Sequence, residues 1–313
     1  MRYARQTAQA AFLMIAAALP SPARGEQILA LQDSIIGPGR HARLVAYLTR
    51  ESLFGIPKDI EHTNVTFFAG SHTLGTANTG EAGMAILECP IPSDVPDEIR
   101  AEATYSGNRM EGTARLFHWT DRKIAVCIDI DDTISRTDLD DVLLDEEDDD
   151  SKPLRHSRET LQYLSEDYHI FYLTARPSFL LEKTRNWLSS RGFPAAPVIV
   201  SHRKRDLLQQ AEYKERMLRT LQKDWPNILI GIGDKATDAQ AYGERDMLAI
   251  IVRGKKPEEI GRHALMMPDW KTIHRFFRNN RHILTNAQNC RLAIAGKQPL
   301  LLTVNTYDRD EDD

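Results

Sequence analysis

Cysteine is scarce in this chain of 313 residues, which contains only Cys89, Cys127 and Cys290. Three scattered cysteines are too few for a disulfide framework or a zinc site. Cys127 lies in an apolar run, where a small core residue is expected. A large excess of charge of one sign is also lacking, since the net charge is -5 and the pI about 6.1. The composition therefore gives no indication of a nucleic-acid-binding protein.

Long apolar runs are missing from the body of the chain, which predicts that it has no transmembrane segment. At the N-terminus, two arginines precede an acid-free apolar run at residues 8–19, and small residues follow at positions 21–23. This order is typical of a cleaved secretory signal peptide, with an ordinary first helix as the alternative. We predict a signal peptide at residues 1–23 and an exported product, periplasmic or secreted. Its removal takes away two positive charges and changes the net charge from -5 to -7.

Residues 24–119 alternate between short strand-like runs and turn residues. The strand-like runs are 43–49, 64–68, 83–87, 99–105 and 113–117. Glycine and proline separate them, and no helical stretch lies between them. This pattern predicts a small antiparallel β-sandwich, which resembles the immunoglobulin-like modules that precede enzymes in many exported bacterial proteins. No residue pattern in it indicates catalysis, so a scaffold or a docking surface is its expected role.

The pattern changes at residue 120, where the apolar runs become continuous and helix-like stretches separate them. The apolar runs are 124–128, 170–173, 197–200, 228–232 and 248–252, and the helix-like stretches include 158–166, 179–191 and 212–223. Continuous apolar strands are buried on both faces, which predicts an α/β domain with a parallel sheet over residues 120–280. Ligands bind such sheets at the carboxyl ends of the strands. Residues 281–313 are expected to form a mobile tail.

Acidic residues gather at two of the predicted strand ends. Asp129, Asp131 and Asp132 follow the first strand of the α/β domain, and burying them is unfavourable unless a cation or a reaction needs them. The spacing of Asp129 and Asp131 suits a nucleophile and a proton donor, although an acidic loop after a strand is the plain alternative. Asp234 and Asp238 lie one helical turn apart, so that both can face the same site.

Together these strings resemble the motifs of the haloacid dehalogenase (HAD) superfamily. The matching strings are Asp-Ile-Asp-Asp-Thr at 129–133, Tyr-Leu-Thr-Ala-Arg-Pro at 172–177, Tyr-Lys-Glu-Arg at 213–216 and Gly-Asp-Lys-Ala-Thr-Asp at 233–238. They occur in the order of the family, each at a predicted strand end or helix start. Asp132 departs from the glycine that the family usually has there. The likeness covers about residues 123–270, implies a HAD-like (Rossmann-type) domain, and is strongest to the lipin and actin-patch-type phosphatidate phosphatases.

The resemblance implies roles for individual residues. Asp129 is the expected nucleophile, and Asp131 is the expected proton donor and later the base. Thr174 is expected to hydrogen-bond the phosphoryl group in transfer. Lys214 is expected to neutralise charge in the transition state, with Lys204 and Lys235 as competitors for this role.

The resemblance also implies a magnesium ion. The carboxylates of Asp129 and Asp234 and the backbone carbonyl of Asp131 are its expected ligands. Asp238 is expected to orient the water shell of the metal or the catalytic lysine. All these ligands are oxygen atoms, which favour Mg²⁺ over zinc.

Basic side chains supply candidates for substrate binding. Arg176 is one, because its planar fork pairs with two oxygens of a phosphate. Lys204 is another, within the basic segment 202–205 that follows the third strand. A solvated turn is the alternative interpretation of this segment.

An acidic run at residues 138–150 contains nine Asp or Glu among thirteen residues. It is too short and too polar for a folded cap over the site. A solvated flexible loop is the plain interpretation, and a contact with divalent cations or a basic partner is the alternative. Without a cap, the site should be open to large substrates.

The sequence therefore predicts a magnesium-dependent phosphomonoester hydrolase that acts through an aspartyl-phosphate. Phosphatidate or a related lipid phosphate is the first expected substrate, and soluble phosphate esters, including nucleotides, are the alternative. A non-catalytic binding protein on a HAD scaffold is a third possibility, against which the intact acids argue. A weaker likeness to polynucleotide phosphatases lies at residues 184–188 and 214–215. Overall acidity and predicted export argue against a nucleic-acid partner.

Overall fold

The computed structural model of this chain describes residues 26–51, 57–136, 151–202, 206, 208–252 and 264–302. Several sequence features lie outside the described residues: the predicted signal peptide at 1–23, the acidic run at 138–150, the basic residues 203–205 with Lys204, and the terminal acids at 308–313. What the sequence predicts of them stays a prediction.

The described part of the N-terminal region consists of strands and one short 3-10 helix. The elements are β1 (Gln27–Leu31), β2 (Ser34–Ile36), β3 (His41–Arg50), β4 (Lys58–Asp59), β5 (Asn64–Ala69), β6 (His72–Asn78), η1 (Glu81–Gly83), β7 (Met84–Pro90), β8 (Glu98–Tyr105) and β9 (Asn108–His118). One sheet has the order β1-β3-β4, with β7 also paired to β3, and the other has the order β2-β9-β8-β5-β6. All pairs are antiparallel except β2 with β9. The sequence predicted five of these strands.

The alternation of side chains explains how the two sheets pack. In β5, Val65, Phe67 and Ala69 are fully buried, whereas their neighbours in the strand are not. Successive side chains of a strand point to opposite faces, so every second residue can enter the core. Residues of both sheets meet in one apolar cluster. The region is therefore a pair of β-sheets around a shared core.

The C-terminal region is built around a parallel sheet with the strand order β12-β11-β10-β13-β14-β15. The strands are β10 (Ala125–Ile128), β11 (His169–Pro177), β12 (Val198–Ser201), β13 (Ile228–Gly233), β14 (Leu248–Val252) and β15 (Ala264–Met267). Every residue of β10, β12, β13 and β14 is buried. Burial on both faces is why their sequences are continuously apolar. The predicted mixed α/β organisation, with a β-rich N-terminal region, is confirmed.

Helices connect these strands and follow the last of them. They are α3 (Ser157–Asp167), η2 (Ser178–Leu180), α4 (Leu181–Ser190), α5 (Gln210–Asp224), α6 (Ala236–Gly243), α7 (Trp270–Asn279), α8 (Arg281–Leu284) and α9 (Ala287–Ile294). Leu284 and Cys290 are fully buried in the same apolar cluster as β10 and α7. The expectation of a mobile segment from residue 281 is therefore wrong for residues 281–294, because their apolar side chains pack onto the domain. None of the described helices has the length and apolarity of a membrane span.

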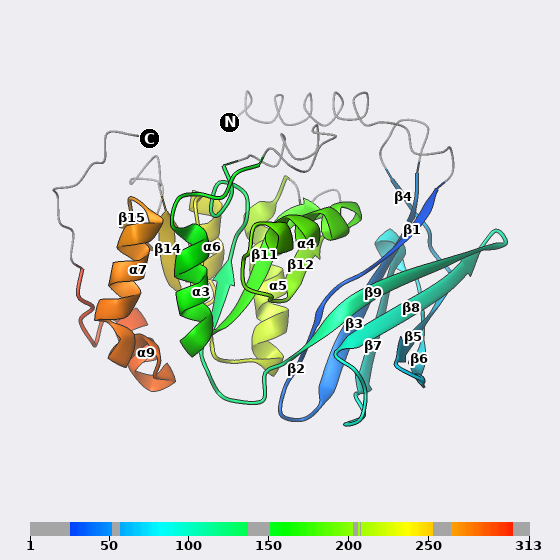
Figure 1. Cartoon of the computed structure of the whole chain (residues 1–313), viewed down its shortest axis with the longest axis horizontal. Coiled ribbons are helices and arrows are strands. Elements are labelled where there is room, and N and C mark those ends of the chain that lie inside the picture. The colour runs from blue at the N-terminus through cyan, green and yellow to red at the C-terminus, as the bar shows by residue number, and fades with distance from the viewer. Residues whose placement is uncertain are drawn as a thin grey trace.

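The two regions share apolar packing and lie side by side, with the N-terminal sheets next to the β12 side of the parallel sheet (Figure 1). Ala30, Val45 and Tyr47 of the N-terminal region belong to the same cluster as Val198 and Val200 of β12. Burial of apolar surface is the main favourable term in such packing. The junction is thus continuous with the core of the α/β region.

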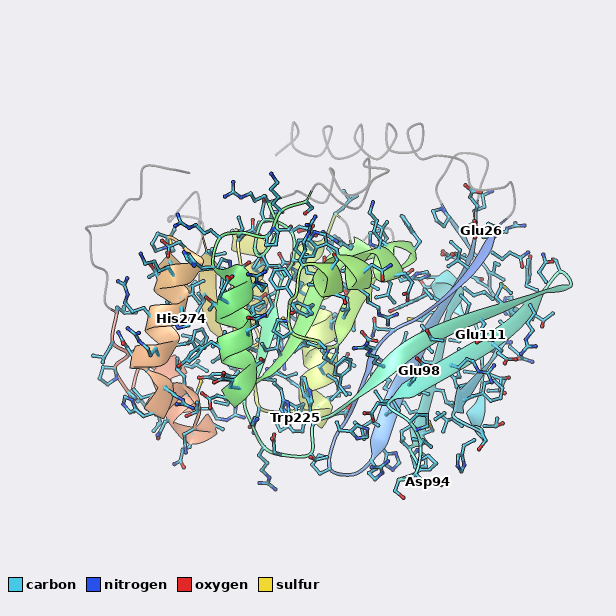
Figure 2. The ribbon with its side chains drawn as sticks, in the orientation of Figure 1. Glu26, Asp94, Glu98, Glu111, Trp225 and His274 are labelled. Atoms are coloured by element: carbon cyan, nitrogen blue, oxygen red, sulfur yellow. The ribbon has the colours of Figure 1, made fainter. Side chains whose placement is uncertain are left out.

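Aromatic rings fasten the segment that joins the two regions. Trp119 follows β9 and stacks on His169, with ring centroids 4.7 Å apart, and meets Trp225 edge-on at 5.3 Å. Trp225 lies just before β13, at the amino-terminal edge of the parallel sheet (Figure 2). Edge-on and stacked rings contribute beyond their buried area. This anchor leaves the opposite edge of the sheet for the site.

His202, which directly follows β12, makes further contacts across the junction. Its ring stacks on Tyr47, with centroids 4.5 Å apart, and its Nε2–H donates to the carbonyl oxygen of Ala82. Its Nδ1 lies within hydrogen-bonding distance of Ser178, and Asp59 lies 3.4 Å from Nε2. The basic segment 202–205 was expected to hold an anion or to form a solvated turn. Its one described residue, His202, is instead part of the junction.

Candidate active site

The predicted site residues come together where β10, β11 and β13 end. Asp129 and Asp131 follow β10, and Thr174 lies near the end of β11. Arg176 also belongs to β11, and Asp234 follows β13. Lys214 and Asp238 reach the same place from α5 and α6. The carboxyl edge of a parallel sheet is where α/β proteins bind their ligands.

Lys214 lies between two carboxylates. Its Nζ is 2.8 Å from Asp129 Oδ1 and also donates to Asp238 Oδ1. All three side chains are almost completely buried, with exposed fractions of 2%, 7% and 1% respectively. A buried charge is tolerated only when it is paired and hydrogen-bonded. Of the candidates Lys214 and Lys235, which the structure describes, Lys214 is the one placed against Asp129, and Lys204 lies outside the described residues.

The pKa values reflect this crowding. Burial raises the pKa of Asp129 to about 6, with repulsion from Asp238 and Asp131 acting in the same direction and attraction to Lys214 opposing it. Burial also raises the pKa of Asp234 to about 8, helped by repulsion from Asp129 and Asp238. Burial alone lowers the pKa of Lys214, but Asp129 and Asp238 raise it above its ordinary value. The lysine therefore stays charged while the carboxylates repel one another.

Thr133 connects two of these acids, although the sequence analysis gave it no role. Its hydroxyl lies 3.2 Å from Asp129 Oδ2 and 3.3 Å from Asp234 Oδ1. A hydroxyl carries one proton, so it serves only one of the two carboxylates at a time. The signal for it was present in the sequence, because Thr133 closes the Asp-x-Asp-x-Thr string.

Asp132 explains why the related motifs favour glycine at its position. Its φ is 56°, in the left-handed region that residues with a side chain rarely occupy. Aspartate tolerates this conformation better than most residues, because its short polar side chain can hydrogen-bond locally. The turn after β10 thus keeps its shape without glycine.

Asp131 is held by an arginine. Arg176 Nη2 donates to Asp131 Oδ1 over 2.7 Å, and its Nε is 3.1 Å from the same oxygen and 3.2 Å from Oδ2. The Thr174 hydroxyl lies 3.3 Å from Oδ2. The second terminal nitrogen of Arg176 donates to the Thr184 hydroxyl at 3.2 Å. The arginine expected to bind substrate is thus placed on the expected proton donor, and direct phosphate contact stays a prediction.

Asp238 is positioned by backbone groups at the start of α6. Its Oδ2 accepts from the backbone N–H groups of Asp234 and Lys235, at 3.2 and 3.1 Å. Gly233 allows this approach, because a Cβ there would lie 2.5 Å from Cγ and Oδ2 of Asp238. Both oxygens of Asp238 are therefore engaged, one with Lys214 and one with the backbone.

The site has the ligand chemistry that a magnesium ion needs. Carboxylate oxygens of Asp129, Asp234 and Asp238 lie within 4.8 Å of one another. Lys214 and two backbone N–H groups hold both oxygens of Asp238, whereas Asp129 Oδ2 and Asp234 Oδ1 share the one hydroxyl proton of Thr133. Asp129 and Asp234 are therefore the better placed carboxylate ligands. Their raised pKa values show that a positive charge would be stabilising there. The residues fit a hard divalent cation bound by oxygen.

Residues 126–249 match the family model of the PITM 1-3 LNS2 domain. The match covers the elements that carry the site from Asp129 to Asp238, and less than half of the chain. It supports a HAD-like phosphatase at the level of the superfamily. No curated protein matches the chain.

Solved structures similar to the chain fall into two groups. A HAD-superfamily hydrolase from Ehrlichia chaffeensis has 16% identity and a TM-score of 0.36, covering 53% of this chain and 100% of that one. The M1 domain from titin has 18% identity and a TM-score of 0.21, covering 29% and 94%. The Ig1-2 module of the Drosophila receptor tyrosine phosphatase DLAR has 12% identity and a TM-score of 0.23, covering 34% of this chain and 61% of that one. At these TM-scores the similarities carry no argument about fold or function.

The first prediction concerns the approach of Asp238 to Gly233. In Gly233→Ala, the new Cβ must displace the Asp238 carboxylate, which is engaged with Lys214. We expect the thermal midpoint to fall by about 3 to 10 °C, as for an overpacked core, and kcat on an aryl phosphate to fall at least about tenfold. Gly243→Ala is the matched control, because nothing lies within 4 Å of its Cβ position. Equal behaviour of the two variants would contradict the packing argument.

The second prediction concerns metal and pH. Raised carboxylate pKa values mean that the metal-free folded state binds protons more tightly than the unfolded chain does. Asp129 and Asp234 therefore contribute stability at low pH, and this stability is lost as pH rises through about 6 and about 8. Metal ions bind the deprotonated carboxylates. We expect Mg²⁺ to raise the thermal midpoint by about 5 °C or more at pH about 8, and by about 2 °C or less at pH about 5.

Differential scanning fluorimetry in chelator and in Mg²⁺ measures this difference. Asp234→Asn should abolish the Mg²⁺ effect, since an amide is a weaker ligand and does not titrate. A Mg²⁺ shift of equal size at both pH values, or one that persists in this variant, would show that the ion binds elsewhere.

Proposed function

We propose that the protein is a magnesium-dependent phosphomonoester hydrolase that uses Asp129 as its nucleophile. The observation that carries this proposal is the buried contact between Asp129 and Lys214. A second acid, Asp131, follows Asp129 by two residues, and Arg176 holds its carboxylate in place. The family-model match over this region supports the same reaction class. The magnesium ion and the lipid substrate are further parts of the proposal.

In the first step, a carboxylate oxygen of Asp129 attacks the phosphorus atom. The bond between phosphorus and the ester oxygen breaks, and this oxygen keeps the electron pair and takes a proton from Asp131. Lys214 and Thr174 offer hydrogen-bond donors close to the attacking and donating carboxylates, where negative charge develops on the phosphoryl oxygens. Aspartyl-phosphate and a free alcohol are the products.

In the second step, a water molecule attacks the aspartyl-phosphate. Asp131 removes a proton from this water, the acyl phosphate bond breaks, and the Asp129 carboxylate is restored with release of inorganic phosphate. Arg176 stabilises the Asp131 carboxylate that exists between the two steps, because its nitrogens already contact both oxygens. Asp129 and Asp234 would hold the Mg²⁺ ion, which would supply positive charge between the nucleophile and the anionic substrate.

The favoured substrate class is a lipid phosphate, with phosphatidate first. The similarity of the site strings to phosphatidate phosphatases and the LNS2 match support this choice. The alternative is a phosphatase for soluble phosphate esters, which would use the same site and the same two steps. A comparison of substrates separates the two.

The third prediction concerns the nucleophile. Asp129→Asn should lower kcat by at least about a thousandfold, because an amide cannot attack phosphorus, while the thermal midpoint stays near that of the wild type. Asp132→Asn is the control, since it removes the same charge from the same turn and asparagine tolerates the left-handed backbone. Steady-state hydrolysis of p-nitrophenyl phosphate measures both. Retention of a tenth or more of the wild-type kcat in Asp129→Asn rules this residue out.

The fourth prediction concerns the substrate. Phosphatidate in mixed micelles should be hydrolysed with kcat/KM at least about tenfold above those of glycerol phosphate and nucleotides, because a lipid specificity must show in kcat/KM. Replacing Arg203, Lys204 and Arg205 with Ala should raise KM for phosphatidate more than for a small aryl phosphate. If soluble phosphates are preferred, the lipid assignment fails and the phosphatase assignment stands.

A further inference from the structure

Asp33 is a buried carboxylate at the junction of the two regions. It lies between β1 and β2, and its side chain is 4% exposed. Its Oδ1 accepts from the backbone N–H of Arg115, in its own region, at 3.0 Å. Its Oδ2 accepts from the backbone N–H of Val198 at the start of β12, also at 3.0 Å. This acid therefore ties the N-terminal sheets to the edge strand of the α/β region.

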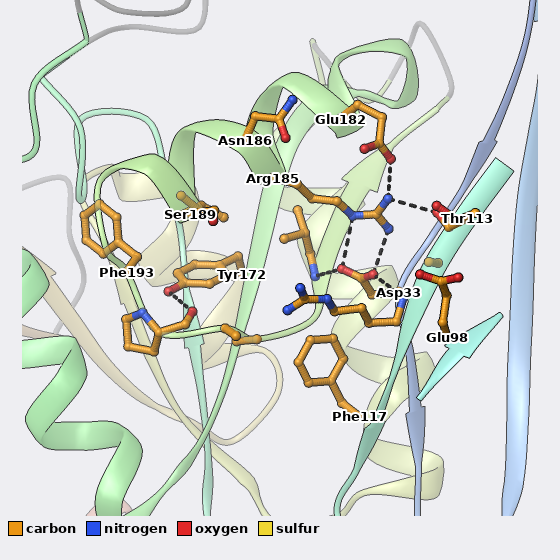
Figure 3. A pocket seen from close by; sticks show the side chains of 17 residues that line it. Asp33, Glu98, Thr113, Phe117, Tyr172, Glu182, Arg185, Asn186, Ser189 and Phe193 are labelled. Atoms are coloured by element: carbon orange, nitrogen blue, oxygen red, sulfur yellow. Dashed lines mark hydrogen bonds and ion pairs between the residues drawn. The ribbon is translucent and has the colours of Figure 1, made fainter. Parts of the chain in front are cut away.

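Arg185 of α4 completes the contact from the other side. Its Nη2 lies 2.8 Å from Asp33 Oδ1 and 2.8 Å from the carbonyl oxygen of Leu31. Its Nη1 donates to the carbonyl oxygen of Thr113 at 3.2 Å. Figure 3 shows the contacts of Arg185 with Asp33 and Thr113 beside a cavity of about 320 Å³ between the two regions. Three acceptors of the N-terminal region thus hold one arginine of α4.

The residue before this arginine contacts the active site. Thr184 is fully buried, and its hydroxyl accepts from Arg176 Nη1. Arg176 in turn holds Asp131 by three contacts of 2.7 to 3.2 Å. Adjacent residues on a helix point about 100° apart, so one turn of α4 can face the junction and the site at once. Asp33, Arg185, Thr184, Arg176 and Asp131 form a continuous set of contacts, called here the α4 contact chain.

We propose that the N-terminal region positions the catalytic proton donor through the α4 contact chain, with Asp33 and Arg185 as positioning residues. This inference rests on the proposed function, in which Asp131 gives its proton to the leaving oxygen. A donor that is displaced by a fraction of an ångström transfers its proton poorly, and supporting residues decide whether it is held in place. In this proposal the N-terminal sheets contribute to catalysis by holding Asp131 in position.

A general anchoring role and a positioning role predict different losses. Loss of a proton donor slows the departure of an alkoxide, which needs a proton, far more than the departure of p-nitrophenolate, which does not. A variant that is merely less stable loses active molecules and slows both reactions equally. The ratio of the two rates is therefore the informative quantity, because it does not depend on the fraction of folded enzyme.

The experiment measures kcat and KM for glycerol phosphate and for p-nitrophenyl phosphate in the full chain with Mg²⁺. In Asp33→Asn, we expect kcat/KM for glycerol phosphate to fall at least about tenfold more than kcat/KM for p-nitrophenyl phosphate. This quantity covers only the steps up to departure of the leaving group, and so it leaves out the second step, in which Asp131 acts as the base for both substrates. Asp131→Asn gives the upper limit of this selective loss. Asp97→Asn, in the same region with a 77% exposed side chain, should leave the ratio unchanged.

Two further variants test the path. Arg185→Lys keeps the charge but loses the fork, and Thr184→Val keeps the shape but loses the hydroxyl that Arg176 donates to. Both should show the same selective loss of activity on glycerol phosphate. When either is combined with Asp33→Asn, the fold loss of the double variant should be smaller than the product of the two single fold losses. If Asp33→Asn does not fold, these two variants decide the question.

The outcomes separate this inference from the proposed function. Equal losses on both substrates, or none, in Asp33→Asn and Thr184→Val overturn the positioning role, while the phosphatase assignment stands. A wild-type chain that hydrolyses neither ester nor phosphatidate in mixed micelles overturns the proposed function, and the positioning role with it.

Discussion

Four carboxylates gather where three buried strands end, and the compensation of their charge is the constraint on which this edge of the sheet depends. Buried like charges repel strongly, because little water screens them. Lys214 offsets Asp129 and Asp238, and Arg176 offsets Asp131. Asp234 has a weaker share of this compensation, and its pKa is raised to about 8. An acid whose charge is only weakly compensated, next to the proposed nucleophile, suits the proposed cation site.

The elements that a single strand or helix determines were predictable from the sequence. Runs such as 228–232 and 248–252 are apolar throughout, because both faces of each strand are buried, and they match β13 and β14 closely. The acids at their ends were predictable for the same reason, since a polar residue after such a run marks the edge of the sheet. Asp129, Asp131 and Asp234 were identified in this way, whereas Thr174 and Lys214 were identified from the family resemblance. β15 was missed although its four residues are all apolar, and Met267 is the one of them that is buried.

The contacts between elements were not predictable in the same way. Thr184 and Asp33 are single polar residues without a pattern, and what gives them meaning is a partner far away in the chain. The position of Arg176 near the end of β11 suggests a phosphate ligand, yet Asp131 and Thr184 already occupy its guanidinium group. The segment beyond residue 280 ends in the acidic stretch 308–313, which favoured its interpretation as a mobile tail. Leu284 and Cys290 nevertheless find cover against the domain.

The shared apolar packing at the junction has a consequence for how the chain folds and evolves. Tyr47 and Val45 of β3 cover Val198 and Val200 of β12, so neither region presents a finished polar surface to the other. An α/β region produced alone would expose this strand edge to water and to other copies, and exposed strand edges favour aggregation. We therefore expect the described parts of both regions to unfold together. If the two regions were exchanged between proteins as modules in evolution, they would have to move together. Otherwise the surface of β12 would have to change with each new neighbour.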